Sequence, residues 1–94
     1  MIKYENGFKN DYMTVTFYPK REYQKPYIIV RDLTDGFNEP TAYTRKVRGI
    51  EKAWQFITII MNKFELQDDL KMRDITNILD DKFHLDTHYY CAMD

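Results

Sequence analysis

The stretch from Gly49 to Phe64 (GIEKAWQFITIIMNKF) constrains the fold of this chain more than any other part of the sequence. Its apolar residues recur at helical spacing and fall within an arc of roughly 120° on a wheel of about 100° per residue. These residues are Ile50, Ala53, Trp54, Ile57, Ile60, Met61 and Phe64. Phe56 and Ile59 lie outside this arc. The stretch therefore predicts an amphipathic helix that needs apolar cover on more than one side.

Ahead of this helix, β-branched and aromatic residues in alternating patterns predict three strands. The strands span Tyr12 to Tyr18, Tyr27 to Leu33, and Thr41 to Val47. In addition, Ile2 to Glu5 followed by Asn6-Gly7 indicates a short strand that ends in a two-residue type I′ turn. Because short connections favour antiparallel neighbours, we expect a meander of three strands, or four with the first, that is covered by the helix on one face.

Alternation within the strands separates an inward set of side chains from an outward set. The inward set is Met13, Val15, Phe17, Ile28 and Val30. The outward set is Tyr12, Thr14, Thr16, Tyr18, Tyr27, Ile29 and Arg31, joined by Tyr43 and Arg45 if the third strand has the matching register. We expect the main arc of the helix to pack on the inward set, which leaves a Tyr- and Arg-rich face on the other side of the sheet.

A second helix is predicted from about Leu70 to Phe83, with Asp68 or Asp69 as its N-cap. Its apolar residues are Met72, Ile75, Ile78, Leu79 and Phe83, and they provide the expected cover for Phe56 and Ile59. The opposite side is acidic and contains Asp74, Asn77, Asp80 and Asp81, with Arg73 among them. The fold expected for residues 1–94 is a single α+β domain, in which an antiparallel meander is followed by two helices packed on one face.

The composition is that of a small globular protein without disulfides. The chain has 94 residues, of which 44% are hydrophobic and 16% aromatic, and its one cysteine, Cys91, cannot form an intramolecular bridge. The N-terminus has no signal-peptide pattern, and the longest strictly apolar runs are three residues, whereas a membrane helix needs about 20. We therefore expect a cytoplasmic protein, located in the host cytoplasm if a phage encodes it, with no membrane contact.

Residue usage indicates the kind of genome that encodes the chain. Residue types with AT-rich codons (Phe, Tyr, Met, Ile, Asn and Lys) number 42, whereas Gly, Ala, Arg and Pro together number 14. The sequence has no Ser and three Ala, which is common in small, fast-evolving genes. A phage or another mobile element of low GC content is the expected source.

Charge is distributed unevenly although the net charge is −1. Residues 1–50 contain nine Lys or Arg and six Asp or Glu, whereas residues 51–94 contain five and nine. Carboxylates along a helix face, here Asp74, Asp80 and Asp81, can imitate a phosphate backbone, although a solvated helix face has the same pattern. The acidic helix is therefore one candidate binding surface.

The outward face of the sheet is the second candidate surface. It combines Tyr12, Tyr18 and Tyr27 with Arg31 and Arg45. Tyr and Arg are enriched at protein interfaces, and aromatic and basic residues together also form platforms for single-stranded nucleic acid. Exposed Tyr is in addition ordinary on a solvated sheet, because the ring packs along its neighbours while the hydroxyl stays in water.

Catalytic and metal-binding interpretations have less support. His84, His88 and Cys91 would share one face if the tail were helical, but the tail is equally compatible with an edge strand or a coil, and no CxxC or HExxH pattern accompanies them. A Gly-rich phosphate loop is absent, and the lack of Ser excludes a serine hydrolase. A helix-turn-helix from Met72 to Tyr90 would place acidic residues next to DNA. We expect no enzyme activity, no catalytic residues, no cofactor and no metal.

The β-β-β-α order with a further helix, in a short chain rich in AT-coded residues, resembles the small anti-CRISPR and other host-takeover proteins of phages that infect low-GC bacteria. The resemblance covers roughly Tyr12 to Phe83 and concerns topology and composition. Some of these proteins block the DNA-binding site of a nuclease with an acidic surface, for which Asp74, Asp80 and Asp81 are residues of the matching type. This chain is nearly neutral, whereas DNA mimics are usually strongly acidic.

The resemblance implies a non-enzymatic protein that binds and inhibits a host protein, such as a CRISPR nuclease or another defence protein. The alternative is a nucleic-acid-binding regulator that uses the Tyr- and Arg-rich face of the sheet. A homodimer that covers the outlying apolar residues of the first helix is compatible with both interpretations.

Overall fold

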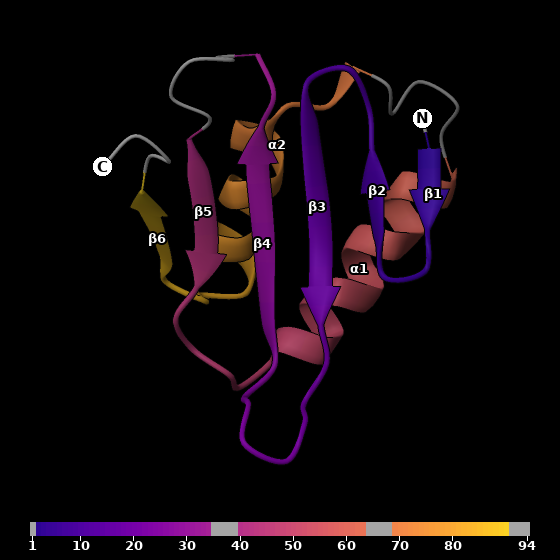
Figure 1. Ribbon diagram of the computed structural model, residues 1–94. Coiled ribbons are helices and arrows are strands. Elements are labelled where there is room, and N and C mark those ends of the chain that lie inside the picture. The colour runs from indigo at the N-terminus through magenta and orange to yellow at the C-terminus, as the bar shows by residue number, and fades with distance from the viewer. Residues whose placement is uncertain (1, 35–39, 64–68, 91–94) are drawn as a thin grey trace.

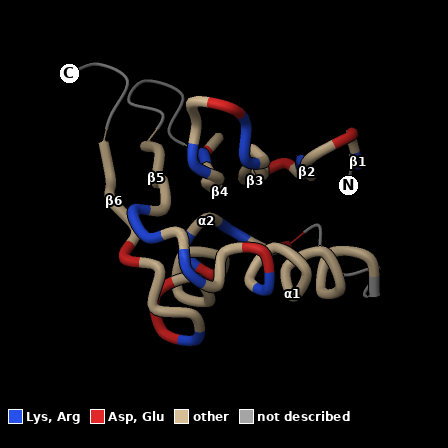
Figure 2. Tube along the Cα trace, turned by 90° about the horizontal axis from the view of Figure 1, so that it is seen from below, with Lys and Arg blue, Asp and Glu red and all other residues tan. Residues whose placement is uncertain are grey.

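The computed structural model describes residues 2–34, 40–63 and 69–90. Its strands are β1 (Ile2–Tyr4), β2 (Gly7–Lys9), β3 (Met13–Tyr18), β4 (Tyr27–Asp32), β5 (Thr41–Thr44) and β6 (Thr87–Tyr90), and its helices are α1 (Ile50–Lys63), α2 (Met72–Asn77) and the π-helix η2 (Ile78–Lys82). The strands form one antiparallel sheet in chain order, and the helices lie together on one of its faces (Figure 1, Figure 2). None of the helices in the described ranges is long and apolar enough to cross a membrane.

The expected α+β class and the placement of the helices on one face are confirmed, but the expected count of three or four strands is wrong, because the sheet has six. The two strands that were missed are β2 and β6, with three and four residues. Strands this short contain too few residues for alternation to stand out in a sequence. They form because their neighbours, the six-residue β3 and the four-residue β5, supply hydrogen-bonding partners along their length.

The first hairpin turns one residue earlier than predicted. Tyr4 pairs with Gly7, so Glu5 and Asn6 form the loop, and neither Asn6 nor Gly7 has a positive φ. The predicted type I′ turn at Asn6-Gly7 is therefore wrong. Gly7 belongs to β2, where a Cβ atom would lie 2.5 Å from the carbonyl oxygen of Val15 and 2.6 Å from the ring of Tyr4. Glycine is needed at position 7 because the Val15 backbone and the Tyr4 ring approach it closely, and not because a turn requires a positive φ there.

Replacing Gly7 with alanine is expected to lower the free energy of unfolding by about 1 to 3 kcal/mol, because the added methyl group overlaps a backbone oxygen and the Tyr4 ring. The Tyr4 hydroxyl, which hydrogen-bonds Thr16 Oγ1 at 2.7 Å, would be displaced together with its ring. Urea denaturation measures the loss, and hydrogen exchange of the β1 amides shows where it occurs. Lys9→Ala in the same strand, whose side chain is exposed, is the control and should change stability by less than about 0.5 kcal/mol.

The core lies between the sheet and the helices, and the predicted inward set forms its sheet side. Met13, Val15, Ile28 and Val30 are buried, and Phe17 is half-buried with its ring stacked on Trp54 at 5.6 Å between centroids. The helix contributes Ile50, Ala53, Ile57 and Met61. Helix α1 begins at Ile50, since Gly49 has a φ of 86°, which an α-helix cannot contain. Phe64 lies outside the described residues.

The second helical segment differs from the single helix predicted from Leu70 to Phe83. Helix α2 begins after Lys71, whose N–H donates to Asp74 Oδ2 at 2.9 Å, so neither predicted cap is used: Asp69 precedes this position and Asp68 lies outside the described residues. After Asn77 the chain continues as the π-helix η2. The predicted apolar side is confirmed, because Met72, Ile75 and Leu79 are buried and Ile78 and Phe83 pack against the core.

The two large residues outside the main arc of α1 have different environments. Phe56 packs edge-on against Phe83 at 5.6 Å between ring centroids, as predicted. Ile59 is 61% exposed, so the prediction that the second helix covers this residue is wrong. The two helical segments lie side by side beneath the sheet (Figure 2).

Candidate functional site

The face of the sheet that points away from the helices, called the open face below, is the first candidate site. The register arranges its outward side chains in three rows. The upper row consists of Ile2, Lys9, Thr14, Arg31, Thr41 and Tyr90. The middle row consists of Tyr4, Gly7, Thr16, Ile29, Tyr43 and His88. The lower row consists of Tyr18 and Tyr27. The helical layer leaves this face uncovered in the described part of the chain (Figure 2).

Charge on the open face is confined to its edges. None of the outward strand positions in the described ranges is Asp or Glu. Lys9 and Arg31 lie in the upper row, and Lys25 and Arg45 lie just beyond the lower end of the sheet. Within the described strands, the middle row contains no Lys, Arg, Asp or Glu. The open face therefore has an aromatic and hydroxyl-bearing centre between two basic edges.

Ring contacts order the aromatic side chains of this face. Tyr18 and Tyr27 stack with 4.6 Å between ring centroids and 11° between ring planes. The ring of Tyr43 lies 5.3 Å from that of His88 and 5.8 Å from that of Tyr90. Such contacts stabilise neighbouring rings relative to one another and reduce the entropy that is lost when a partner binds.

A groove of about 400 Å³ opens on the lower half of this face, between the Tyr18–Tyr27 stack and the Tyr43 cluster. It is called the open-face groove below. Its lining consists of Lys25, Pro26, Tyr27, Ile29, Tyr43, Thr44, Arg45, Val47 and Tyr90. Pro26 and Thr44 are buried, whereas Lys25, Arg45 and Val47 are exposed. The groove thus has an apolar and aromatic interior with two cations at its rim.

The rim forms where β5 ends, three residues earlier than the predicted boundary at Val47. The side-chain oxygen of Thr44 accepts the N–H of Ile28 at 3.0 Å. The next two N–H groups, those of Arg45 and Lys46, both donate to the carbonyl oxygen of Leu85 at 3.2 Å. These bonds draw the backbone out of the sheet and leave the Arg45 side chain beside the groove.

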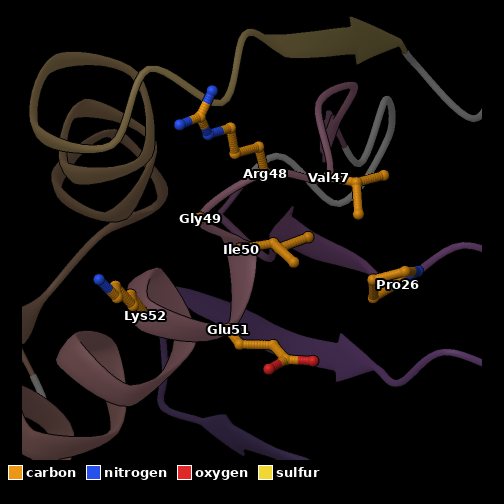
Figure 3. A pocket seen from close by; sticks show the side chains of 7 residues that line it. All are labelled: Pro26, Val47, Arg48, Gly49, Ile50, Glu51 and Lys52. Carbon is orange, nitrogen blue, oxygen red and sulfur yellow. The ribbon is translucent and has the colours of Figure 1, made fainter.

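Two further hollows meet the groove at Pro26 and Val47. One lies along the β3–β4 connection, and the other lies before α1 (Figure 3). In Figure 3, Pro26, Val47 and Ile50 face a common space, while the side chain of Arg48 extends away from it. Charged residues lining the groove and the hollows are Lys20, Arg21, Lys25, Arg45, Arg48 and Lys52, against Glu22 and Glu51. The combined lining of the groove and the two hollows is therefore basic.

The structure brings most of the predicted Tyr and Arg residues together. Tyr18, Tyr27 and Arg31 lie on the open face, and Arg45 lines its groove. Tyr12 lies apart from them. It precedes β3 in a bend where Asn10 Oδ1 accepts its N–H at 2.8 Å, and the ammonium nitrogen of Lys71 lies 5.3 Å from the centroid of its ring.

Lys25 and Tyr90 line the groove but were not among the predicted site residues. Tyr90 was missed because its strand, β6, was not recognised. The alternation of His88 and Tyr90 with Thr87 and Tyr89 was the available signal, but four residues are also compatible with a helix or a coil. Lys25 precedes the strand and has no periodic signal of its own.

Two of the three predicted acidic residues, Asp74 and Asp80, have structural roles that the sequence does not reveal. Asp74 accepts the Lys71 N–H at the start of α2. Asp80 accepts the backbone N–H of Thr87 at 2.8 Å and its hydroxyl at 2.7 Å. Asp81 is exposed. Among the described residues of the helical layer, Lys and Arg positions lie next to Asp and Glu positions along the chain (Figure 2).

The helical tail that a zinc site would require is not formed. His88 belongs to strand β6, His84 lies in the segment between η2 and β6 with a φ of 54°, and Cys91 is outside the described residues. Within residues 2–34, 40–63 and 69–90, no group of three or more His, Cys, Asp or Glu could hold a metal ion. The strand conformation of Thr87–Tyr90 also contradicts a helix-turn-helix in this region.

Comparison with known proteins identifies no relative. No family model matches the chain, and neither a curated protein nor a solved structure is significantly similar to it. The function must therefore be inferred from the chemistry of the described surfaces.

Proposed function

We propose that this protein acts by binding another protein through the open face of its sheet. The observation that carries the proposal is the arrangement of charge: the middle row of the described strands has Tyr, Thr, Ile, Gly and His but no Lys, Arg, Asp or Glu, and cations lie at both edges. The cores of protein interfaces are depleted in charge and enriched in aromatic residues, and their rims are polar. Tyr and Arg are also the residue types most often found at binding hot spots.

An inhibitory, host-takeover role fits this surface, because a small domain can block a larger protein by occupying its working surface. We propose the open face and not the acidic helical side as the contact. The support for this choice is that Asp74 and Asp80 already hydrogen-bond within the fold. An uninvolved carboxylate such as that of exposed Asp81 is too small a feature to imitate a phosphate backbone.

Nucleic acid is the less well supported partner. A platform for single-stranded nucleic acid needs stacking rings and also a basic groove that follows the phosphates. The stacked Tyr18 and Tyr27 meet the first requirement. The requirement for a basic groove is met poorly on the open face, because Arg31 and Arg45 lie at opposite ends of the sheet with uncharged side chains between them. The net charge of −1 also gives little general attraction for a polyanion.

Affinity capture from a lysate of a low-GC bacterial host, with surface variants as controls, tests the proposal. Tyr43→Ala is expected to weaken the captured complex by about 30-fold, the effect of an interface hot spot of about 2 kcal/mol. Ile59→Ala and Asp81→Lys, which change exposed residues of the helical layer, should leave capture unchanged.

The opposite pattern, in which Asp81→Lys abolishes capture and Tyr43→Ala does not, would favour the acidic surface and contradict the proposal. If no protein is captured and labelled oligothymidylate binds with a steep salt dependence, the nucleic-acid alternative replaces it. Far-ultraviolet circular dichroism of each variant excludes loss of folding as the cause.

A further inference from the structure

We infer that the open-face groove binds an acidic segment of the partner protein, with one aromatic side chain of that segment inserted between Tyr27 and Tyr43. The inference rests on the proposed function and specifies the chemistry of the partner at this point. It follows from the cross-strand positions of the two Tyr residues, from the charge of the rim and from the lack of Lys and Arg in the middle row of the described strands.

The spacing of Tyr27 and Tyr43 suits one flat group. Ile29 lies directly opposite Tyr43, so Tyr27 and Tyr43 are diagonal neighbours across β4 and β5. Diagonal neighbours in an antiparallel pair are about 7 to 8 Å apart. A ring stacked between two others needs planes about 7 to 8 Å apart, twice the optimal carbon–carbon separation of about 3.5 to 4.0 Å, so the register sets the two residue positions at a separation of the order that one inserted ring requires. Half-buried Ile29 provides an apolar contact at the base of this gap.

The neighbouring ring contacts preserve the gap. Tyr27 stacks on Tyr18, on the side of β3, and Tyr43 is supported by His88 and Tyr90, on the side of β6. Each ring is therefore packed away from the other, and the space between them belongs to the open-face groove. A group that enters finds both walls already ordered, so little side-chain entropy is lost on binding.

The charge of the rim selects an acidic segment. Lys25 and Arg45 are exposed at the groove, and no Asp or Glu of the described residues lines it. In the adjoining hollows, cations outnumber Glu22 and Glu51. Carboxylates that flank an inserted ring would be attracted at this end of the molecule, and a basic segment would be repelled.

The same features favour a peptide over a nucleic-acid strand. A nucleotide could place its base in the gap and its phosphate near Arg45. Further phosphates that followed the strand direction up the open face would cross the middle row, where Thr16, Ile29 and Tyr43 offer no cation. A peptide needs acidic groups only beside the anchor and can contact the middle row with uncharged side chains.

Nuclear magnetic resonance titration of the ¹⁵N-labelled protein tests the inference with defined probes. The main probe is a short synthetic peptide with a central Trp flanked by Glu and Gly. Matched peptides have Ala in place of Trp, or Lys in place of Glu, and oligothymidylate is the nucleic-acid probe. We expect the Trp–Glu peptide to shift the amides of Tyr27, Ile29, Tyr43 and Arg45, and both altered peptides to bind more weakly.

A double variant and a matched single variant test whether the cations at the groove rim attract the acidic peptide. Simultaneous Lys25→Ala and Arg45→Ala substitution should weaken binding of the Trp–Glu peptide by about fivefold, as expected for two exposed ion pairs. Arg31→Ala, which removes an exposed arginine from the upper row of the same face, should change the affinity by less than about twofold. The spectrum of each free variant shows that its fold is retained.

Equal affinity for the Glu and Lys peptides would overturn the inference, as would shifts confined to residues outside the groove. Tighter binding of oligothymidylate, lost on removal of Arg45, would identify the groove as a nucleotide site and also overturn it. If the peptides fail while Tyr43→Ala still prevents partner capture, the inference fails and the proposed function stands. If Tyr43→Ala also leaves capture intact, the proposed function fails as well.

Discussion

Replacing Ile57 with alanine is expected to lower the free energy of unfolding by about 2 to 5 kcal/mol, whereas the same change at Ile59 should lower it by less than about 0.5 kcal/mol. The two residues are in the same helix and differ only in environment. Ile57 is fully buried in the core, and Ile59 is 61% exposed. Removing a buried branched side chain loses its transfer free energy and leaves a cavity, while an exposed one loses little.

Urea denaturation followed by tryptophan fluorescence measures this difference. Trp54 is the only tryptophan of the sequence, and its ring contacts those of Phe8 and Phe17, so its emission reports on packing of α1 against the sheet. Similar losses for both variants, together with a denaturation midpoint that rises with protein concentration, would contradict the prediction. They would indicate a homodimer that covers Ile59, which light scattering would detect.

The second large effect is expected at Asp80. Asp80→Ala should lower the free energy of unfolding by about 3 kcal/mol, because hydrogen bonds to an ionised carboxylate contribute about 1.5 to 3 kcal/mol each and the residue is only half-buried. Its two oxygens hold the backbone and the hydroxyl of Thr87 and so attach the start of β6 to η2. Asp81→Ala, one residue later and exposed, should have an effect below about 0.5 kcal/mol.

Denaturation of the two variants and hydrogen exchange of the Thr87 amide provide the measurement. Exchange at Thr87 should accelerate in Asp80→Ala and stay unchanged in Asp81→Ala. Equal stability of the two variants would show that the link between η2 and β6 contributes little. An acidic binding surface is therefore better tested at Asp81 than at Asp80. A change at Asp80 disturbs the strand that carries Tyr90, whereas a change at Asp81 leaves that strand intact.

Much of the sheet and its core could be predicted because the signals are local. The alternation of Met13, Val15 and Phe17 with Thr14 and Thr16 identifies the two faces of β3 whatever its neighbours are. The helical spacing of Ile50, Ala53, Ile57 and Met61 identifies the buried side of α1 in the same way. Both patterns can be recognised in the sequence without tertiary information, because side-chain direction in a strand or helix follows from backbone geometry alone.

The groove could be predicted only in part. Tyr27 was expected on the outward face, and Tyr43 and Arg45 were expected there if the third strand had the matching register. The pairing of Ile29 with Tyr43 shows that the register matches. Lys25 and Tyr90 were not expected there. Tyr90 reaches the groove only because Thr41 pairs with it across some 49 positions of sequence, and no local pattern encodes that contact.

The sequence by itself therefore determined the α+β class, the buried side of each long element and the existence of a Tyr- and Arg-rich face. The tertiary structure decided that this face belongs to six strands, that its cations lie at the edges, and that a groove opens between Tyr27 and Tyr43. It also assigned Asp74 and Asp80 to hydrogen bonds inside the fold. The physical reason is that periodicity is a property of one segment, whereas register, grooves and long-range hydrogen bonds exist only between segments.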